Sequence, residues 1–131
     1  MKLSPKVSIS RRKNRKAHYT AGPAERARRM SSRLSKEQRE LHGIKTMPIN
    51  VGDAVKVMSG VFKGKEGSVT EIIPEKYVVY VDVCENVMVN GQKKPVGIDA
   101  SNLMIVKLNM NPERNNFFKL RNEMKAKINK D

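Results

Sequence analysis

Charge is spread so unevenly along this chain that it limits the possible folds more than any other feature. Residues 1–46 contain 14 Lys and Arg side chains against 3 acids, residues 47–108 contain 7 against 7, and residues 109–131 contain 6 against 3. A globule built from the whole chain would distribute its charge more evenly. The sequence therefore predicts a basic N-terminal arm at 1–46, a neutral folded domain at 47–108 and a basic C-terminal segment at 109–131.

Composition narrows the kind of partner and excludes several functions. The formal net charge of +14 favours a polyanion, with nucleic acid ahead of an anionic membrane surface. One cysteine, Cys84, and two histidines are too few for a disulfide framework or a zinc site. No apolar run reaches the roughly 20 residues of a membrane span, and the sequence shows no carboxylate pair or nucleophile–base pair. We expect no enzyme, no metal, no cofactor, no small-molecule substrate and no membrane partner.

The neutral middle segment predicts a mainly β fold. Asn90 and Gly91 predict a tight hairpin turn with a positive φ at both residues. Stretches rich in β-branched and aromatic residues predict strands at 51–58, 67–73, 76–83, 86–89, 95–98 and 103–108. Five or six short strands in a segment of this length are typical of a small, strongly bent barrel.

Helix signals are found in the N-terminal segment. Residues 1–20 contain no acid and no apolar period, so we expect them to have no structure in the free chain. Pro23 predicts the first turn of a short helix that runs to about Met30. A second helix is predicted after Ser35, because Ser35 and Gln38 have the spacing of a capping box, with Gly43 as its stop.

A third helix is predicted near the C-terminus. Asn111 and Pro112 form a start signal. An apolar stripe then follows at helical spacing, and we expect it to pack on the barrel; its members are Phe117, Leu120, Met124 and Ile128. We expect Arg114, Arg121 and Lys125 to lie largely off this stripe.

The stretch 60–69, between two predicted strands, contains three glycines at a spacing that indicates a tight loop. Phe62, Lys63 and Lys65 are candidate RNA contacts there, because a ring can stack on a base and a cation can pair with a phosphate. The alternative is that the glycines only turn the chain and that Phe62 lies in the core. A nucleotide-binding phosphate loop is excluded, because the spacing is one residue short and Glu66 stands where Ser or Thr must hold magnesium.

The arm contains the densest cluster of cations in the chain, with five Lys and Arg among residues 11–16. Phosphates would neutralise such a cluster, and nearby rings and amides could add stacking and hydrogen bonds. The candidate RNA-binding residues of the arm are Arg11, Arg12, Lys13, Asn14, Arg15, Lys16, His18, Tyr19, Arg26, Arg28, Arg29 and Arg33. A nuclear-import signal, a solvated tail and an organelle transit peptide are alternatives for the same cluster.

Several stretches together resemble a known family. Segments 53–57 and 60–69 resemble the KOW motif of ribosomal proteins and transcription elongation factors. The segments 12–21, 30–39, 47–49, 77–81, 96–98 and 101–103 extend this resemblance to the universal large-subunit ribosomal protein L twenty-four family, in its eukaryotic and archaeal branch, called L twenty-six in eukaryotes. Asp99 and Ala100 stand where that family usually has His-Pro, so no contact is carried over to them.

This resemblance implies an SH3-like barrel, the KOW domain, with a structural role in the large ribosomal subunit. It also implies binding to large-subunit ribosomal RNA near its 5′ region, a part in subunit assembly close to the nascent-chain tunnel exit, and neighbouring ribosomal proteins as partners. The expected location is the cytoplasmic ribosome, with assembly in the nucleus or nucleolus if the chain is eukaryotic.

Two alternatives remain beside the ribosomal one. A transcription-elongation KOW module would bind nascent RNA or polymerase, but it should follow an α/β domain, for which residues 1–46 are too short and too basic. An adaptor that reads a modified peptide would need converging rings, whereas Tyr77 and Tyr80 would face opposite sides of one strand.

Overall fold

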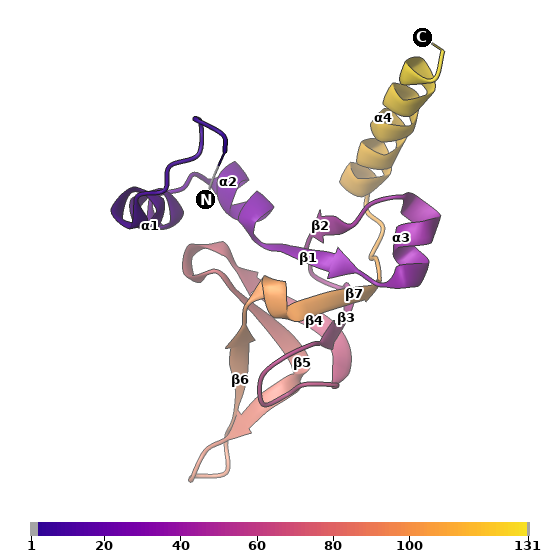
Figure 1. The fold of residues 1–131 in the computed structure, drawn as a ribbon. Coiled ribbons are helices and arrows are strands. Elements are labelled where there is room, and N and C mark those ends of the chain that lie inside the picture. The colour runs from indigo at the N-terminus through magenta and orange to yellow at the C-terminus, as the bar shows by residue number, and fades with distance from the viewer. Residues whose placement is uncertain (1–2, 131) are drawn as a thin grey trace.

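The computed structural model describes residues 3–130 and shows one curved sheet that carries helices at one end (Figure 1). Seven strands are hydrogen-bonded in the order β2-β1-β7-β3-β4-β5-β6. In chain order they are β1 (Ser31–Leu34), β2 (Thr46–Pro48), β3 (Ala54–Val57), β4 (Glu66–Ile73), β5 (Val78–Val87), β6 (Lys93–Ile98) and β7 (Leu103–Lys107). The helices are α1 (Arg11–Tyr19), α2 (Pro23–Arg29), α3 (Lys36–His42) and α4 (Pro112–Ile128), with short 3₁₀ turns η1 (Pro74–Lys76) and η2 (Ala100–Asn102). The prediction of a mainly β fold is confirmed, and the bent sheet is consistent with a small barrel.

The sheet bends because its alternation of buried and exposed residues is interrupted. In β3 and β7 every second residue is buried, as period-two alternation requires. In β5 the pattern breaks, because the next buried residue after Val81 is Cys84. The register with β6 shifts between Tyr80 and Glu85 in this region. Such irregularities increase the local twist and let a short sheet curve around a core.

Strand β1 was not predicted. It pairs antiparallel with β2 and parallel with β7, where Arg33 lies opposite Met104. Ser32 and Leu34 are buried by these neighbours. The sheet therefore begins inside the predicted arm: the described residues 3–46 hold three helices, strand β1 and the start of β2, where we expected two short helices. The domain boundaries drawn from charge stay a prediction.

Two of the predicted helices begin and end as expected. Gly22 precedes α2, which has Pro23 at its first position. The Ser35 side chain accepts a hydrogen bond from the backbone N–H of Gln38 at 3.4 Å, and α3 ends at Gly43 with a left-handed φ of 64°. These local signals act through the first and last backbone groups of a helix, so they need no knowledge of the rest of the fold.

The expectation that residues 1–20 have no structure is wrong for residues 11–19. Helix α1 forms there, because Arg, Lys and Ala are strong helix formers even where no apolar period exists. The chain before it, from Leu3 to Ser10, forms no regular helix or strand.

The hairpin between β5 and β6 turns differently from the prediction. The N–H of Gly91 donates to the carbonyl of Met88 at 2.9 Å, and the N–H of Met88 donates to the carbonyl of Gln92 at 2.8 Å. Gly91 has a φ of 87°, but Asn90 does not have a positive φ. The loop thus has three residues with one left-handed glycine, and of the predicted strand at 86–89 only residues 86 and 87 lie in a strand, at the end of β5.

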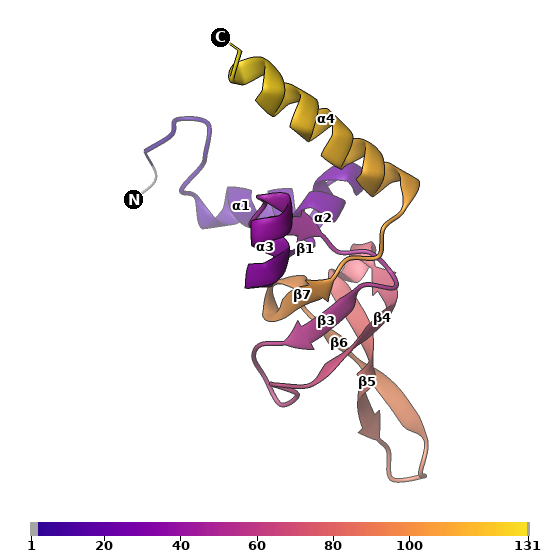
Figure 2. The same cartoon turned by 90° about the vertical axis from the view of Figure 1, so that its right-hand side faces the viewer.

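Helix α4 projects from one end of the sheet (Figure 2). The expectation that its apolar stripe packs on the barrel is wrong, because Phe117, Leu120, Met124 and Ile128 are 46%, 57%, 64% and 72% exposed. Arg114, which was expected to lie off the packed face, is instead 4% exposed. The cause is Asp53, a fully buried carboxylate that requires a cation and receives it from the first turn of α4.

Candidate nucleic-acid interface

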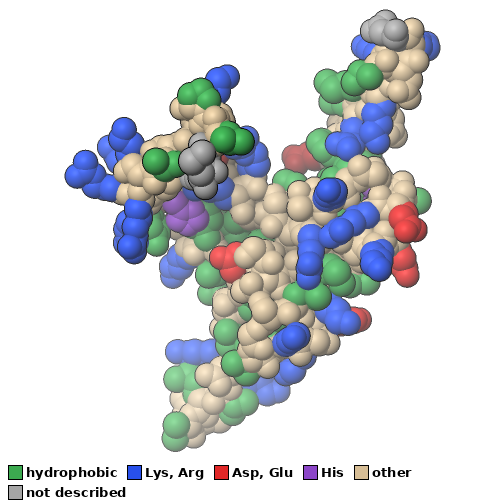
Figure 3. Space-filling view, viewed as in Figure 1, with side chains coloured by type: hydrophobic (Ala, Val, Ile, Leu, Met, Phe, Trp, Pro, Cys, Tyr) green, Lys and Arg blue, Asp and Glu red, His purple; other side chains and the backbone are tan. Residues whose placement is uncertain are grey.

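The cations of α1 face solvent. Arg11, Arg12, Lys13, Arg15 and Lys16 are all exposed, and the helix contains no acid. Within residues 3–130, none of the five forms an ion pair. Figure 3 shows blue side chains projecting outward around α1, on the left of the molecule. A surface with this charge attracts polyanions and offers donors to several phosphates at once.

Helix α1 is fixed to the sheet by Tyr77. The Tyr77 hydroxyl donates to the backbone carbonyl of His18 at 2.5 Å, and the two rings stack with centroids 4.0 Å apart. Tyr77 is 9% exposed and has a left-handed φ of 55°, which is uncommon for a bulky residue. The Tyr77 ring thus contacts the end of α1 through His18.

Arg26 completes the same attachment. Its guanidinium donates to the carbonyl oxygens of Tyr19 at 2.6 Å, Ala21 at 2.9 Å and Glu75 at 2.9 Å, with a longer bond to Pro74 at 3.3 Å. It also lies 5.0 Å from the centroid of the Tyr77 ring. We name His18, Arg26 and Tyr77 the arm clamp. Arg26 was expected to contact RNA, but these bonds already occupy its Nε, Nη1 and Nη2 atoms within the chain.

The remaining candidates of the arm differ in how free they are. Asn14 donates its side-chain amide to the carbonyl of Ser8 at 3.0 Å, and the Arg15 guanidinium lies 4.9 Å from the Tyr19 ring. Arg28 and Arg29 share the Glu25 carboxylate, at 3.2 and 3.3 Å.

The other candidate RNA-binding residues of the arm are His18, Tyr19 and Arg33. The Nδ1 atom of His18 lies 3.1 Å from the Arg29 guanidinium. The Tyr19 ring is 57% exposed, and Arg33 is exposed on β1. Tyr19 is therefore the aromatic residue of the arm that can stack on a base, since the His18 ring is already stacked on Tyr77.

The loop between β3 and β4 presents two lysines. Gly60 and Gly64 have φ values of 93° and 89°, which only glycine adopts at little cost. Phe62 is partly buried against the core, and the Lys65 ammonium lies 5.0 Å from its ring. Phe62 thus packs on the core, which was the alternative to its stacking on a base. Lys63 and Lys65 are exposed and remain candidates for phosphate contacts.

The arm and the loop do not form one continuous patch, because α1 and the β3–β4 loop lie at different ends of the sheet in both views (Figures 1 and 2). Sequence reasoning missed that Tyr77 attaches the arm, since it considered this residue only within the predicted strand 76–83, the family resemblance and a peptide-reading cage. No local signal marks it, because the groups that it holds are about 60 positions away in the chain.

Other kinds of site find no support in the described residues. Among residues 3–130 no three His, Cys, Asp or Glu side chains are grouped so that they could hold a metal ion. None of the helices described is both long enough and apolar enough to cross a membrane. Cys84 is buried, and burial raises the pKa of its thiol, with a lowering effect from Lys65 and a further rise from Asp82.

Comparison with known proteins gives consistent matches over most of the chain. A family described as the ribosomal proteins L26 of eukaryotes and L24 of archaea matches residues 8–121. The large ribosomal subunit protein uL24 of Schizosaccharomyces pombe is 40% identical over 114 residues, which are 87% of this chain and 90% of the relative.

Two further relatives carry the same name. The protein of Dictyostelium discoideum is 36% identical over 126 residues, 96% of this chain and 91% of the relative. That of Caenorhabditis elegans is 40% identical over 114 residues, 87% of this chain and 80% of the relative. These matches confirm the family resemblance drawn from the sequence, and each relative is named as a protein of the large ribosomal subunit. This chain therefore belongs to the family of the eukaryotic ribosomal proteins L26 and their archaeal L24 counterparts.

Proposed function

We propose that this chain binds large-subunit ribosomal RNA through the cations of α1, as a structural component of the large ribosomal subunit. The observation that carries the proposal is a helix with five exposed cations, no acid and no internal ion pairs, held in place by the arm clamp. The relatives support the setting, because each is named as a large ribosomal subunit protein.

Repulsion within α1 is the physical reason for expecting phosphates there. Arg11 and Arg15 are four residues apart, as are Arg12 and Lys16, and like charges at that spacing destabilise a helix. Arg11, Arg12 and Lys13 also lie in the first turn, where the helix dipole disfavours cations. Phosphate groups beside these side chains would offset both the repulsion between the cations and their unfavourable interaction with the helix dipole. RNA binding and the stability of α1 would therefore reinforce each other.

The arm clamp supplies preorganisation. A free arm would lose its conformational freedom on binding, and that loss would reduce the affinity. The hydrogen bonds of Tyr77 and Arg26 order the end of α1 before RNA is present. In this proposal Arg26 and Tyr77 position the arm, while the cations and Tyr19 contact the nucleic acid.

Secondary contacts follow from exposure. Arg28 and Arg29 extend the basic surface from α2, Arg33 lies on β1, and Lys63 and Lys65 form a separate basic point on the β3–β4 loop. Two contact regions at different ends of the sheet would fix the orientation of the chain on a folded RNA. Phosphate contacts of this kind position a protein without reading sequence.

The finer location is also part of the proposal. The family resemblance supports contact with the 5′ region of the large-subunit RNA near the nascent-chain tunnel exit, and a part in subunit assembly. It likewise supports neighbouring ribosomal proteins as partners and a cytoplasmic ribosome, with nuclear or nucleolar assembly in a eukaryote. The relatives favour this ribosomal setting over the transcription-elongation alternative, because each is named as a large ribosomal subunit protein.

The salt dependence of RNA binding tests the proposal. A fragment from the 5′ region of large-subunit RNA is titrated over a series of KCl concentrations with the parent chain and with a variant in which Arg11, Arg12, Lys13, Arg15 and Lys16 are all Ala. Each lost phosphate contact reduces the slope of log K against log salt by about 0.7 to 0.9. If all five cations contact phosphates, we expect the magnitude of the slope to fall by roughly 3.5 to 4.5, with the sheet still folded by circular dichroism.

A matched variant controls for net charge. It carries Ala at Lys93, Lys94, Lys119, Lys127 and Lys130, which removes the same number of charges from exposed positions away from the arm. Its salt slope should change by less than about 1. An unchanged slope in the arm variant, or equal losses in both variants, would contradict the proposal.

A further inference from the structure

The exposed apolar stripe of α4 is unexplained by RNA binding. We define the α4 stripe as Phe117, Leu120, Met124 and Ile128, which lie within one broad face of the helix at 100° per residue. Their exposed fractions rise from 46% to 72% along the helix. Together they leave apolar area in water on the order of the few hundred Å² that marks an interaction site.

The helix is anchored so that the stripe stays uncovered by its own chain. Arg114 is bound to the buried Asp53, the Arg121 side chain donates to the carbonyl of Gly43 at 3.0 Å, and the Phe118 ring stacks on His42 at 4.4 Å. These contacts hold the other side of the first turns against the sheet and α3. The stripe is therefore presented by a fixed helix rather than by a loose one.

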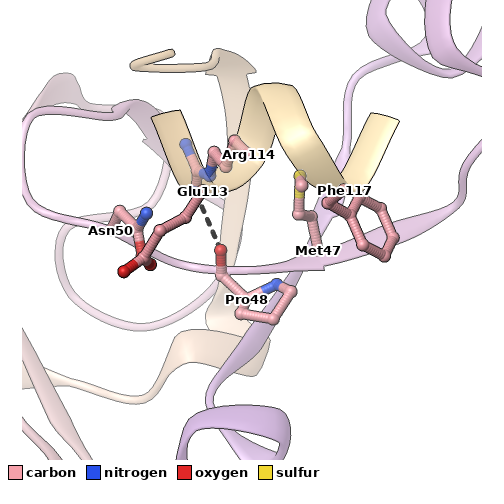
Figure 4. A pocket seen from close by; sticks show the side chains of 6 residues that line it. All are labelled: Met47, Pro48, Asn50, Glu113, Arg114 and Phe117. Atoms are coloured by element: carbon pink, nitrogen blue, oxygen red, sulfur yellow. Dashed lines mark hydrogen bonds between the residues drawn. The ribbon is translucent and has the colours of Figure 1, made fainter. Parts of the chain in front are cut away.

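Two hollows lie along the stripe and share Phe117. The first, of about 220 Å³, lies between β2 and the start of α4, lined by Met47, Pro48, Asn50, Glu113, Arg114 and Phe117 (Figure 4). The second, of about 290 Å³, is lined by Phe117, Leu120, Arg121 and Met124. Hollows of this kind accept the projecting side chains of a partner, which is how hot-spot residues of protein interfaces are seated.

Charge identifies the chemistry of the occupant. By helical spacing three cations border the stripe, namely Arg121, Lys125 and Lys127, against two acids, Glu113 at its base and Glu123 beside Leu120, so cations outnumber acids along its edges. An apolar segment with Asp or Glu at its edges would complement this pattern. A second copy of the chain would bring the same cations and a net charge of +14, so it would be repelled.

A protein explains the stripe better than RNA does. Three of its four side chains are aliphatic, and these cannot stack on bases as aromatic rings do. Protein interfaces are enriched in Phe, Met and Arg at their centres, and interfaces with nucleic acid are more polar. From this we infer that α4 docks a neighbouring protein of the ribosomal particle through a segment with apolar residues flanked by acids. This inference rests on the ribosomal setting proposed above.

Site-specific crosslinking in intact large subunits tests the inference. A photo-crosslinking amino acid replaces Leu120 or Met124 in one set of chains and Asn122 or Ala126, which lie on the opposite face, in the control set. The crosslinked products are identified by mass spectrometry. We expect the stripe positions to crosslink to a peptide of another protein that contains apolar residues and at least two acids, with about fivefold or higher yield than the controls.

Charge reversal makes the chemistry of the partner part of the test. Lys127→Glu should lower the crosslinking yield from Met124 several-fold, whereas Lys119→Glu, on the far side of the helix, should leave it unchanged. Crosslinks to RNA, to a second copy or to a peptide without acids, equal yields at both faces, and no crosslinks at all would each overturn the inference. If the chain were absent from large subunits, the proposed function would be wrong, whatever the stripe binds. The same crosslinking experiment, carried out on the particle that does contain the chain, would then test whether the α4 stripe docks a protein.

Discussion

Arg114 and Asp53 form a bidentate ion pair inside the protein, with Nη1–Oδ1 at 2.5 Å and Nη2–Oδ2 at 2.8 Å. The carboxylate also accepts the backbone N–H groups of Asn50 and Asn109, and the guanidinium also donates to the carbonyls of Pro48 and Asn109. Every oxygen of the carboxylate is thus satisfied. The pair joins the loop before β3 to the first turn of α4, so it determines where this helix leaves the sheet.

Removing the cation should leave an uncompensated buried charge. We expect Arg114→Met to lower the free energy of unfolding by about 3–5 kcal/mol, measured by urea denaturation, because breaking one half of a buried pair has this cost. The amides of α4 should also exchange faster with solvent. Lys119→Met, on the exposed part of the same helix, should change stability by less than about 0.5 kcal/mol. A loss below about 1 kcal/mol for Arg114→Met would show that the pair does not anchor α4.

Gly67 lies in β4, where its surroundings leave no room for a side chain. A Cβ on Gly67 would overlap Oδ1 of Asp82 and would lie 2.8 Å from Cγ2 of Val83 and 2.9 Å from Cγ1 of Val81. We expect Gly67→Val to cost roughly 1–3 kcal/mol or more and to lower the melting temperature, since overpacking forces neighbouring side chains and backbone to move.

Gly22→Ala is the matched control for that substitution. No atom lies within 4 Å of a Cβ at Gly22, and its backbone has an ordinary φ of −71°. Its melting temperature should stay close to that of the parent. Equal melting temperatures for the Gly67 variant and the parent would show that the close packing assigned to β4 is absent.

The arm clamp should affect the affinity for RNA without changing the number of phosphates bound. Tyr77→Phe removes the hydrogen bond to His18, worth about 0.5–1.5 kcal/mol, and keeps the ring. We expect faster amide exchange in α1 and weaker RNA binding, with the salt slope of the parent retained because every cation remains. A changed salt slope, or unchanged exchange in α1, would argue against a positioning role.

Most of the sheet and the capped helices could be predicted because their signals are local. The alternation in β3 and the capping residues of α3 act within a few positions of the sequence. Strand β1 was missed because Ser31–Leu34 has little β-propensity and is held by β7, about 70 positions later. Pairing of this kind depends on the completed sheet.

In the candidate site, too, features with local signals could be predicted and features that depend on distant contacts could not. Exposure of the α1 cations followed directly from their lack of apolar neighbours. The internal role of Arg26 could not be predicted, because its acceptors include the backbone carbonyls of Pro74 and Glu75, which carry no side-chain signature. The exposed stripe of α4 was misjudged for a related reason: the buried carboxylate of Asp53 determines which face of that helix turns inward.

Cys84 should react slowly with thiol reagents in the folded chain. Its side chain is buried, and burial raises the pKa of the thiol, so the folded protein holds less thiolate at pH 8 than the unfolded chain does. Because the folded state favours the neutral thiol, Cys84 adds its full contribution to the free energy of unfolding at pH values below the pKa of the unfolded thiol. That contribution is lost as the pH rises through the higher pKa of the folded state. We expect labelling at pH 8 to be at least about 100-fold slower without urea than with it. Equal rates would show that Cys84 is accessible.

That protection allows the most direct test of the central claim, which is that α1 lies against ribosomal RNA in the assembled subunit. Lys16→Cys adds one exposed thiol, to which an iron chelate is attached before the chain is incorporated into large subunits. Hydroxyl radicals from the chelate cut nearby RNA, and primer extension locates the cuts. The account predicts strong, localised cleavage of large-subunit RNA from Lys16→Cys and none above background from the parent chain, treated identically. Subunits that contain the labelled chain but show no cleavage would contradict it.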